Sequence, residues 1–230
     1  DMAWLLVAAG VINVLYGAVV TIRQTDLKRL VAFSSISHMG YVLIGLSAIA
    51  SKGVDAAAVG LTGASMQMFT HGTITGLMFL TVGMIYDRTH TRYIPDLGGL
   101  SNRIPIIGAA FLIAGLASLG LPGTSGFAAE ILVFLGAFPV WPWPTALAVF
   151  GVVITAGYIL WMSQRTLFGQ MNDRWTKLTD ATKLELIPIG MLVAAILIFG
   201  IYPAFLTDLF KMGIEPIVAM VNSSPEILSR

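Results

Sequence analysis

The sequence predicts an all-α membrane protein, a polytopic helix bundle with about six transmembrane helices. Hydrophobic residues make up 57% of the 230 residues and charged residues only 11%, and the mean hydropathy is +0.85. An ordinary soluble domain carries about 25% charged residues, so composition excludes a soluble globular protein. Apolar stretches of roughly 20 residues, the length that crosses a bilayer, follow one another along the whole chain. One of them is interrupted, and an amphipathic segment follows the last.

The six expected spans share an apolar run of about 20 residues or more, and in chain order they are Ala3–Ile22, Leu30–Ile49, Ala57–Tyr86, Pro105–Phe138, Thr145–Phe168 and Leu186–Leu206. The third and fourth are longer than a straight crossing requires, so each must tilt, extend beyond the bilayer or be interrupted. No soluble domain and no low-complexity linker separates the spans. Residues 1–230 are therefore expected to form a single membrane domain.

The fourth span contains the sequence Gly120-Leu121-Pro122-Gly123-Thr124-Ser125-Gly126. Pro122 lacks an amide donor, and Gly120, Gly123 and Gly126 release the backbone from helical geometry. We expect a discontinuous helix with its break at 120–126, a feature that often marks transport sites in membrane proteins. The alternative is a proline kink whose freed backbone groups are satisfied by neighbouring helices.

The segment that follows the last span, residues 204–221, mixes apolar residues with three charged ones, Asp208, Lys211 and Glu215. This pattern is typical of a short amphipathic helix that lies in the membrane interface. A helix that docks on a partner protein is the alternative.

The charges define an orientation and exclude one class of partner. With 13 Lys and Arg against 12 Asp and Glu the net charge is +1, so there is no basic surface for nucleic acid. Ten of the 13 basic residues lie in or beside the loops 23–29, 87–103 and 165–183, which the positive-inside rule places in the cytoplasm. The three on the opposite side are Lys52, Lys211 and Arg230.

Glu130 is the only one of the 12 acidic residues that lies within an expected span. A carboxylate at membrane depth is costly unless it is paired, hydrated or protonated. Glu130 follows the break by about one turn, where the start of the second half-helix supplies amide donors and a positive dipole that favour the charged form. Burial opposes that effect, and a group balanced between the two can load and release a proton. A structural ion pair with a lysine on another helix is the alternative.

Two of the three histidines, His38 and His71, also lie within expected spans. Ser34 precedes His38 by four residues and Gln67 precedes His71 by four, so on a helix each imidazole faces a hydrogen-bonding side chain. A neutral imidazole can accept a proton on one nitrogen and donate one from the other. We expect both histidines to act with Glu130 as a proton relay, although a buried histidine can also be a satisfied core residue. A metal site is disfavoured because no close ligand spacing such as HExxH is present.

Lys28 and Thr70 are supporting candidates. Lys28 stands at the head of the second span, where it snorkels to the interface or forms the inner end of a proton pathway. Thr70 belongs to a group of small hydroxyl residues that support a water chain or helix packing. The chain has no cysteine and no dinucleotide motif, so we expect no cofactor and no metal in it.

Several of these residues belong to longer motifs, which occur in order along the chain: Thr25-Asp26-Leu27-Lys28-Arg29-Leu30-Val31-Ala32-Phe33-Ser34-Ser35-Ile36-Ser37-His38-Met39-Gly40-Tyr41, Met68-Phe69-Thr70-His71-Gly72, Tyr86-Asp87-Arg88-Thr89-His90-Thr91-Arg92, Gly98-Gly99-Leu100 and Leu121-Pro122-Gly123-Thr124-Ser125-Gly126-Phe127-Ala128-Ala129-Glu130. With these motifs the chain resembles the antiporter-like membrane subunits of respiratory complex I, and among them the M type, also called chain 4. The resemblance covers nearly the whole chain.

The resemblance implies a 14-helix subunit of which this chain is helices nine to fourteen, with the N-terminal half missing. It maps the family's inner histidines onto His38 and His71 and its acidic residue of the discontinuous twelfth helix onto Glu130. It further implies proton translocation coupled to quinone reduction, with NAD, FMN, iron–sulfur clusters and quinone in other subunits. The implied setting is the bacterial inner membrane, with lipid and other membrane-arm subunits as partners.

Two rival interpretations remain open. The same fold serves as a D-type subunit of multisubunit sodium/proton antiporters and in membrane-bound hydrogenases. Alternatively, the chain is a structural membrane scaffold whose buried polar groups only pack. An integral membrane enzyme with its own active site is disfavoured, because the sequence has no nucleophile–base or metal-ligand spacing.

Overall fold

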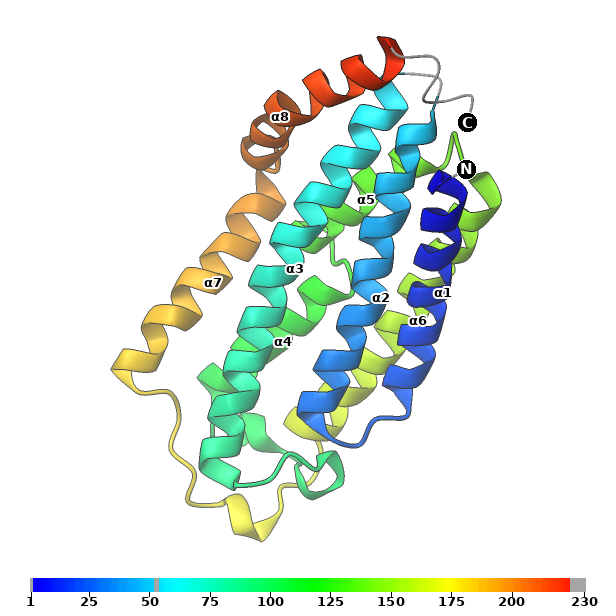
Figure 1. Cartoon of the computed structure of the whole chain (residues 1–230). Coiled ribbons are helices and arrows are strands. Elements are labelled where there is room, and N and C mark those ends of the chain that lie inside the picture. The colour runs from blue at the N-terminus through cyan, green and yellow to red at the C-terminus, as the bar shows by residue number, and fades with distance from the viewer. Residues whose placement is uncertain (1, 52–53, 224–230) are drawn as a thin grey trace.

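The computed structural model describes residues 2–51 and 54–223, and in this part of the chain every regular element is helical. The eight α-helices are α1 (Met2–Ile22), α2 (Leu27–Ser47), α3 (Val54–Thr89), α4 (Pro105–Ser118), α5 (Ser125–Ala137), α6 (Pro142–Leu167), α7 (Lys183–Ile201) and α8 (Ala204–Ser223). Helices α1 to α7 run roughly along one common direction, and α8 lies across one end of the bundle (Figure 1). Lys52 and Arg230, which the charge pattern assigned to the outer side, lie outside the described residues.

The expected fold class is confirmed. Among the residues that the structure describes, five segments are long and apolar enough to cross a membrane, and they correspond to α1, α2 with the turn that follows it, α3, α6 and α7. The third span is uninterrupted: α3 has 36 residues, about 54 Å at 1.5 Å per residue, and so exceeds the roughly 30 Å of hydrocarbon. The fourth span is interrupted, because α4 ends at Ser118 and α5 begins at Ser125.

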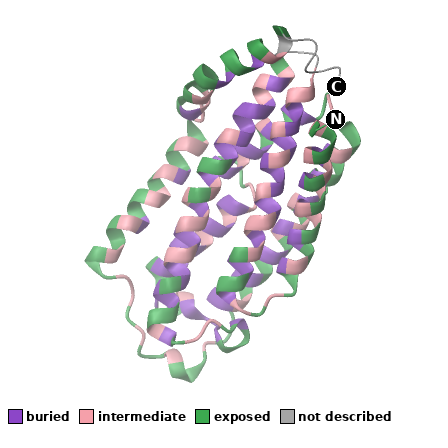
Figure 2. Cartoon of the chain, in the orientation of Figure 1, coloured by how far each residue is buried: buried purple, intermediate pink, exposed green. Residues whose placement is uncertain are grey.

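The helices differ strongly in how much protein surrounds them. Buried residues concentrate on the inner faces of α2, α3 and α5, whereas α7 is exposed along most of its length (Figure 2). The main hydrophobic core is formed by α3, α4 and α6, with Leu77, Phe111 and Ile159 fully buried. Where α3 and α5 cross, Gly60 and Gly136 are in direct backbone contact, so a side chain on either would separate the helices.

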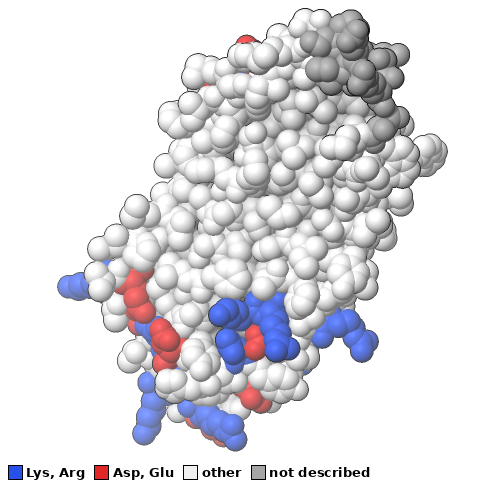
Figure 3. Space-filling model, viewed as in Figure 1, with Lys and Arg blue, Asp and Glu red and all other residues white. Residues whose placement is uncertain are grey.

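Polar contacts organise the end of the bundle where the basic loops lie (Figure 3). Asp26 caps the start of α2 by accepting a hydrogen bond from the Arg29 amide at 2.9 Å. Asp180, from the loop before α7, accepts hydrogen bonds from two amides of the first turn of α4, at 2.8 and 3.2 Å. Charged side chains therefore both mark this end of the bundle and fix its loops.

Helix α8 packs one side on the rest of the protein. Ile214 and Val218 are buried against the first turns of α3, in a small cluster of their own. The charged residues Asp208, Lys211 and Glu215 are exposed, as in the amphipathic helix that the sequence predicts.

Candidate functional site

The three candidate relay side chains come together in the structure. His38 on α2, His71 on α3 and Glu130 on α5 line one small cavity, which Ser118 at the end of α4 also borders. Its volume is about 10 Å³, the space that one water molecule requires. Residues from four helices therefore meet at the level of the break between α4 and α5.

His38 lies at the centre of this cluster and is almost fully buried, with 2% of its surface exposed. Its Nδ1 is 3.6 Å from Glu130 Oε1, and its Nε2 is 3.1 Å from the hydroxyl of Ser118. The first separation is too long for a direct hydrogen bond, whereas the second is one. Each ring nitrogen of His38 thus faces a different polar group, the arrangement that passing a proton across the ring requires.

His71 extends the cluster away from Glu130. Its ring centroid lies 5.1 Å from that of His38, with an angle of 32° between the planes. Its Nε2 is 3.1 Å from the hydroxyl of Ser35 on α2, and the hydroxyl of Thr75, one turn along α3, lies 3.2 Å from the ring nitrogens. Unlike His38, His71 is only half-buried.

Glu130 is 5% exposed, and its position follows from the break. Helical side chains tilt toward the N-terminus of their helix, so the carboxylate of Glu130 reaches back from α5 toward the end of α4. There Gly120 has φ +79°, and a Cβ on it would lie 2.8 Å from Glu130 Oε2. The space that the carboxylate occupies therefore depends on a glycine at position 120.

The rest of the break is fixed by close backbone contacts. Gly126 lies directly against the Ala117 carbonyl oxygen, so α5 starts next to the end of α4. Gly200 of α7 lies directly against the backbone of Gly123 and Thr124, which covers the break from one side. Pro122 is exposed at the surface of the turn. The predicted discontinuous helix is present, but its break covers residues 119–124, and Gly126 already belongs to α5. Small residues on α5 and α7 allow the close approach.

Two supporting residues make contacts other than those that their spacing predicts. The Ser34 hydroxyl donates to the Val31 carbonyl at 2.7 Å and not to His38, because a helical serine readily bonds its own preceding turn. Gln67 lines the small cavity, but its buried Oε1 has no hydrogen bond. Thr70 also lines the cavity and lies 3.4 Å from the Gln67 carbonyl. The expected pairs Ser34–His38 and Gln67–His71 are therefore wrong as direct hydrogen bonds.

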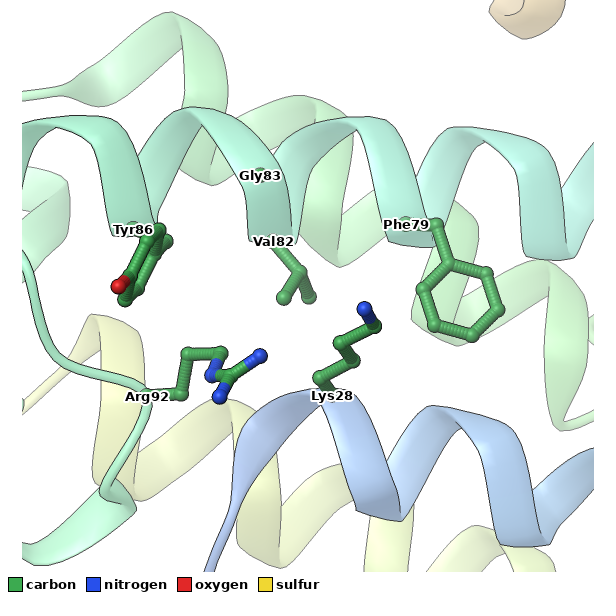
Figure 4. Close-up of a pocket in the computed structure, with 6 residues that line it drawn as sticks. All are labelled: Lys28, Phe79, Val82, Gly83, Tyr86 and Arg92. Atoms are coloured by element: carbon green, nitrogen blue, oxygen red, sulfur yellow. The ribbon is translucent and has the colours of Figure 1, made fainter.

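Lys28 lies in a different cavity, of about 590 Å³, near the basic end of α2 and α3 (Figure 4). Its amino group and the guanidinium of Arg92 point into this space, and Phe79, Val82 and Tyr86 of α3 wall the other side. The Arg92 guanidinium lies over the Tyr86 ring, 5.2 Å from its centroid. The structure therefore does not bring Lys28 into the His–Glu cluster.

Two polar partners of the histidines were not singled out by sequence reasoning: Ser118 and Ser35. Thr75, which belongs with Thr70 to the small hydroxyl residues noted in the sequence, follows His71 by four residues and so lies on the same helix face. Ser118 and Ser35 act across helices, and the sequence carries no signal for such a pairing.

The arrangement is suited to moving protons. His71, His38 and Glu130 form a series in which each group can accept and release a proton, and hydroxyls border the series along its length. Among the described residues, no group of three histidine and acidic side chains has the geometry of a metal site.

The chain is similar to known membrane proteins. Residues 1–155 match the family described as NADH:quinone oxidoreductase/Mrp antiporter, TM. The NADH-quinone oxidoreductase subunit M of Rhodobacter capsulatus is 42% identical over 208 residues, which cover 90% of this chain and 39% of that protein. The chain thus spans about two fifths of the length of that relative.

Two solved structures resemble the fold. A chain of respiratory complex I from Thermus thermophilus with bound NADH superposes with a TM-score of 0.81 at 32% identity, over 96% of this chain and 44% of that one. A chain of the Mrp complex from Dietzia sp. DQ12-45-1b gives 0.84 at 19% identity, over 98% of this chain and 49% of that one, and this likeness concerns the fold alone. Together with the apolar helices, these matches identify an integral membrane protein. The chain belongs to the family of NADH:quinone oxidoreductase and Mrp antiporter transmembrane subunits.

Proposed function

We propose that this chain is the carboxyl-terminal part, helices nine to fourteen, of a 14-helix proton-translocating subunit of an NADH-quinone oxidoreductase. Its similarity to subunit M of Rhodobacter capsulatus supports this proposal, as does Glu130, which the resemblance matches to the acidic residue of the family's discontinuous helix. The preceding helices of the subunit would supply the other half of the proton pathway.

One observation carries the proposal: His71, His38 and Glu130 meet inside the membrane domain, beside a broken helix. A proton that reaches His71 passes to the adjacent ring of His38. His38 then gives up a proton to Glu130 across the 3.6 Å gap. A single water in the small cavity is enough to bridge that gap. Glu130 then releases its proton toward the outer side or toward the central axis of the complex.

The distribution of basic residues indicates the orientation of the chain in the membrane. Loops 23–29, 87–103 and 165–183 lie on the cytoplasmic side of a bacterial inner membrane, as the basic end of the bundle supports. Lipid and the other membrane-arm subunits of the complex surround the exposed helices. NAD, FMN, iron–sulfur clusters and quinone bind in other subunits, and this chain has no cysteine that could ligate a cluster.

The test is Glu130→Gln in the intact complex, reconstituted in vesicles. We expect proton pumping and coupled NADH-quinone turnover to fall together by about tenfold or more, because a glutamine side chain keeps the size of Glu130 but cannot carry a proton. A native gel first establishes equal assembly. Glu215→Gln, which changes an exposed carboxylate on α8, is the matched control and keeps wild-type pumping. Pumping by fully assembled Glu130→Gln complex at the wild-type rate would refute the relay and favour a structural scaffold.

An antiporter subunit is the second candidate, because the matched family includes Mrp antiporters. The chains that co-purify with this one distinguish the two. Peripheral subunits with cysteine-rich cluster motifs indicate a redox-driven pump, either the NADH-quinone oxidoreductase or a membrane-bound hydrogenase. Purely membrane-embedded partners indicate a sodium/proton antiporter.

A further inference from the structure

Buried hydroxyl groups without a partner concentrate on one helix. Seven buried side-chain polar atoms in the described part of the chain have no hydrogen-bond partner. Five belong to α6, namely those of Thr145, Thr155, Tyr158, Ser163 and Thr166. Leaving so many hydroxyls unsatisfied on one helix is unfavourable, and proteins usually satisfy such groups with ordered water.

The five hydroxyls share the buried face of α6. Thr145 and Thr166 are 21 residues apart, about 31 Å along a helix, which equals the thickness of the hydrocarbon layer. Thr155, Tyr158, Ser163 and Thr166 follow one another at intervals of three to five residues, which is about 4.5 to 7.5 Å along the helix axis, a spacing that one or two water molecules bridge. On the opposing helix α4, Gly115 leaves room beside Ser163, whose Oγ lies 3.7 Å from the position that a Cβ would take.

This row connects two sites already described. Its inner part lies beside the relay: the Tyr158 hydroxyl is next to Ser34 and Thr155, without a well-formed hydrogen bond to either, and within electrostatic reach of Glu130. At its other end, Gln164 and Arg165 adjoin Thr166 and line a cavity of about 350 Å³ at the basic end of the bundle. The α6 hydroxyls thus lie between the helix turn that lines this cavity and the surroundings of Glu130.

We propose that water molecules bound to the α6 hydroxyls form a second branch of the proton pathway, from the cavity at Gln164 and Arg165 to Glu130. This inference rests on the proposed function, because it assumes that Glu130 exchanges protons. Each water or hydroxyl along the branch accepts one proton and passes another on, so the chain of groups is left unchanged. The α6 branch exchanges protons between Glu130 and the basic end, and full pumping requires both this branch and the His71–His38 series.

The test removes the hydroxyls without changing side-chain volume. In the intact complex in vesicles, we expect the double variant Thr155→Val, Thr166→Val and the single variant Tyr158→Phe to lower proton pumping by about threefold to tenfold. Thr81→Val is the control: Thr81 is a fully buried threonine on α3 whose hydroxyl donates to the Leu77 carbonyl at 2.9 Å. We expect this control to pump at the wild-type rate.

The outcome separates this inference from the proposed function. If Glu130→Gln abolishes pumping while the α6 variants pump normally, the branch is refuted and the His–Glu relay stands. If the α6 variants fail to assemble, the wild-type complex decides the question by cryo-electron microscopy at a resolution that reveals waters. Water density at the Tyr158 and Thr155 hydroxyls supports the branch, and a dry contact there overturns it.

Discussion

At the basic end of the bundle and in its buried centre, a glutamate lies beside a nitrogen-containing side chain, but the two glutamates differ in how fully their oxygens are hydrogen-bonded. Glu185 accepts hydrogen bonds from both terminal nitrogens of Arg88, at 3.1 and 2.8 Å, and from the backbone and hydroxyl of Thr182, at 2.7 and 2.8 Å. Glu130 lies 3.6 Å from His38 Nδ1, next to a cavity the size of one water. Glu185 is therefore held as a structural anion, whereas Glu130 keeps unused capacity for hydrogen bonds and protons.

The difference shows that contacts which hold the loops in place lie at one end of the bundle, while the groups that can carry protons lie in its centre. At the basic end, saturated contacts fix loops and helix starts, and water reaches much of the surface. In the centre, burial makes every unsatisfied polar group costly, so the polar groups that persist there need a role. The following predictions test that contrast, from the largest expected effect on proton translocation to the smallest.

Replacing His38 with Gln should affect translocation most. Glutamine can still hydrogen-bond Ser118, but it cannot take up and release a proton. We expect pumping per assembled complex to fall by about tenfold or more, measured as proton uptake into vesicles relative to NADH-quinone turnover. Wild-type pumping by an assembled His38→Gln complex would mean that His38 only packs against its neighbours.

Gly120→Ala and Gly123→Ala form a matched pair in the break. Both glycines have positive φ, +79° and +91°, so either alanine costs about 1–2 kcal/mol of backbone strain. Only a Cβ at 120 meets Glu130 Oε2; nothing lies within 4 Å of one at 123. We expect thermal denaturation of the purified complex to show similar destabilisation for both. Pumping should fall by about threefold to tenfold for Gly120→Ala alone, and an equal fall in both variants would contradict the contact with Glu130.

Arg88→Met should alter stability and leave translocation intact. Arg88 is largely buried, and besides Glu185 it donates to the carbonyls of Met84, Thr179 and Asp180. Its loss should destabilise the basic end by about 1–3 kcal/mol, seen as a lower midpoint in thermal denaturation. Arg92→Met is the control, because the Arg92–Asp26 pair is 3.6 Å long and more exposed, and such pairs contribute about 1 kcal/mol or less. Reduced pumping by intact Arg88→Met complexes would contradict the expectation that the contacts of the basic end stabilise the protein without taking part in proton translocation.

Lys28→Met should have the smallest effect. Lys28 is exposed in a cavity that does not include the relay residues. We therefore expect pumping within about twofold of wild type, in the same vesicle assay. A larger loss would make Lys28 the inner end of a proton pathway, the role that the sequence allowed.

The sequence alone was sufficient for the spans and the break. Apolar runs predicted helix bounds within three residues of the observed ones, since a spanning helix must satisfy its own backbone and exclude charge. The exception is the last span, which ends at Ile201 and not at Leu206. The clustering of Pro122 with three glycines predicted the interruption of the fourth span, because proline lacks an amide donor and glycine readily leaves helical geometry. The position of Glu130, His38 and His71 within the apolar spans was equally visible, because ionisable residue types at membrane depth can be read from the sequence.

The partners of these residues were decided only by the tertiary structure. Helical periodicity places Thr75 one turn from His71, but it does not state that Ser118 contacts His38 or that Ser35 contacts His71. Those contacts depend on how far each helix is rotated and shifted against its neighbours, which glycines such as Gly60, Gly126 and Gly136 set by allowing close approach. The sequence thus determined which groups lie inside the membrane, while the packing of the helices determined which of them meet.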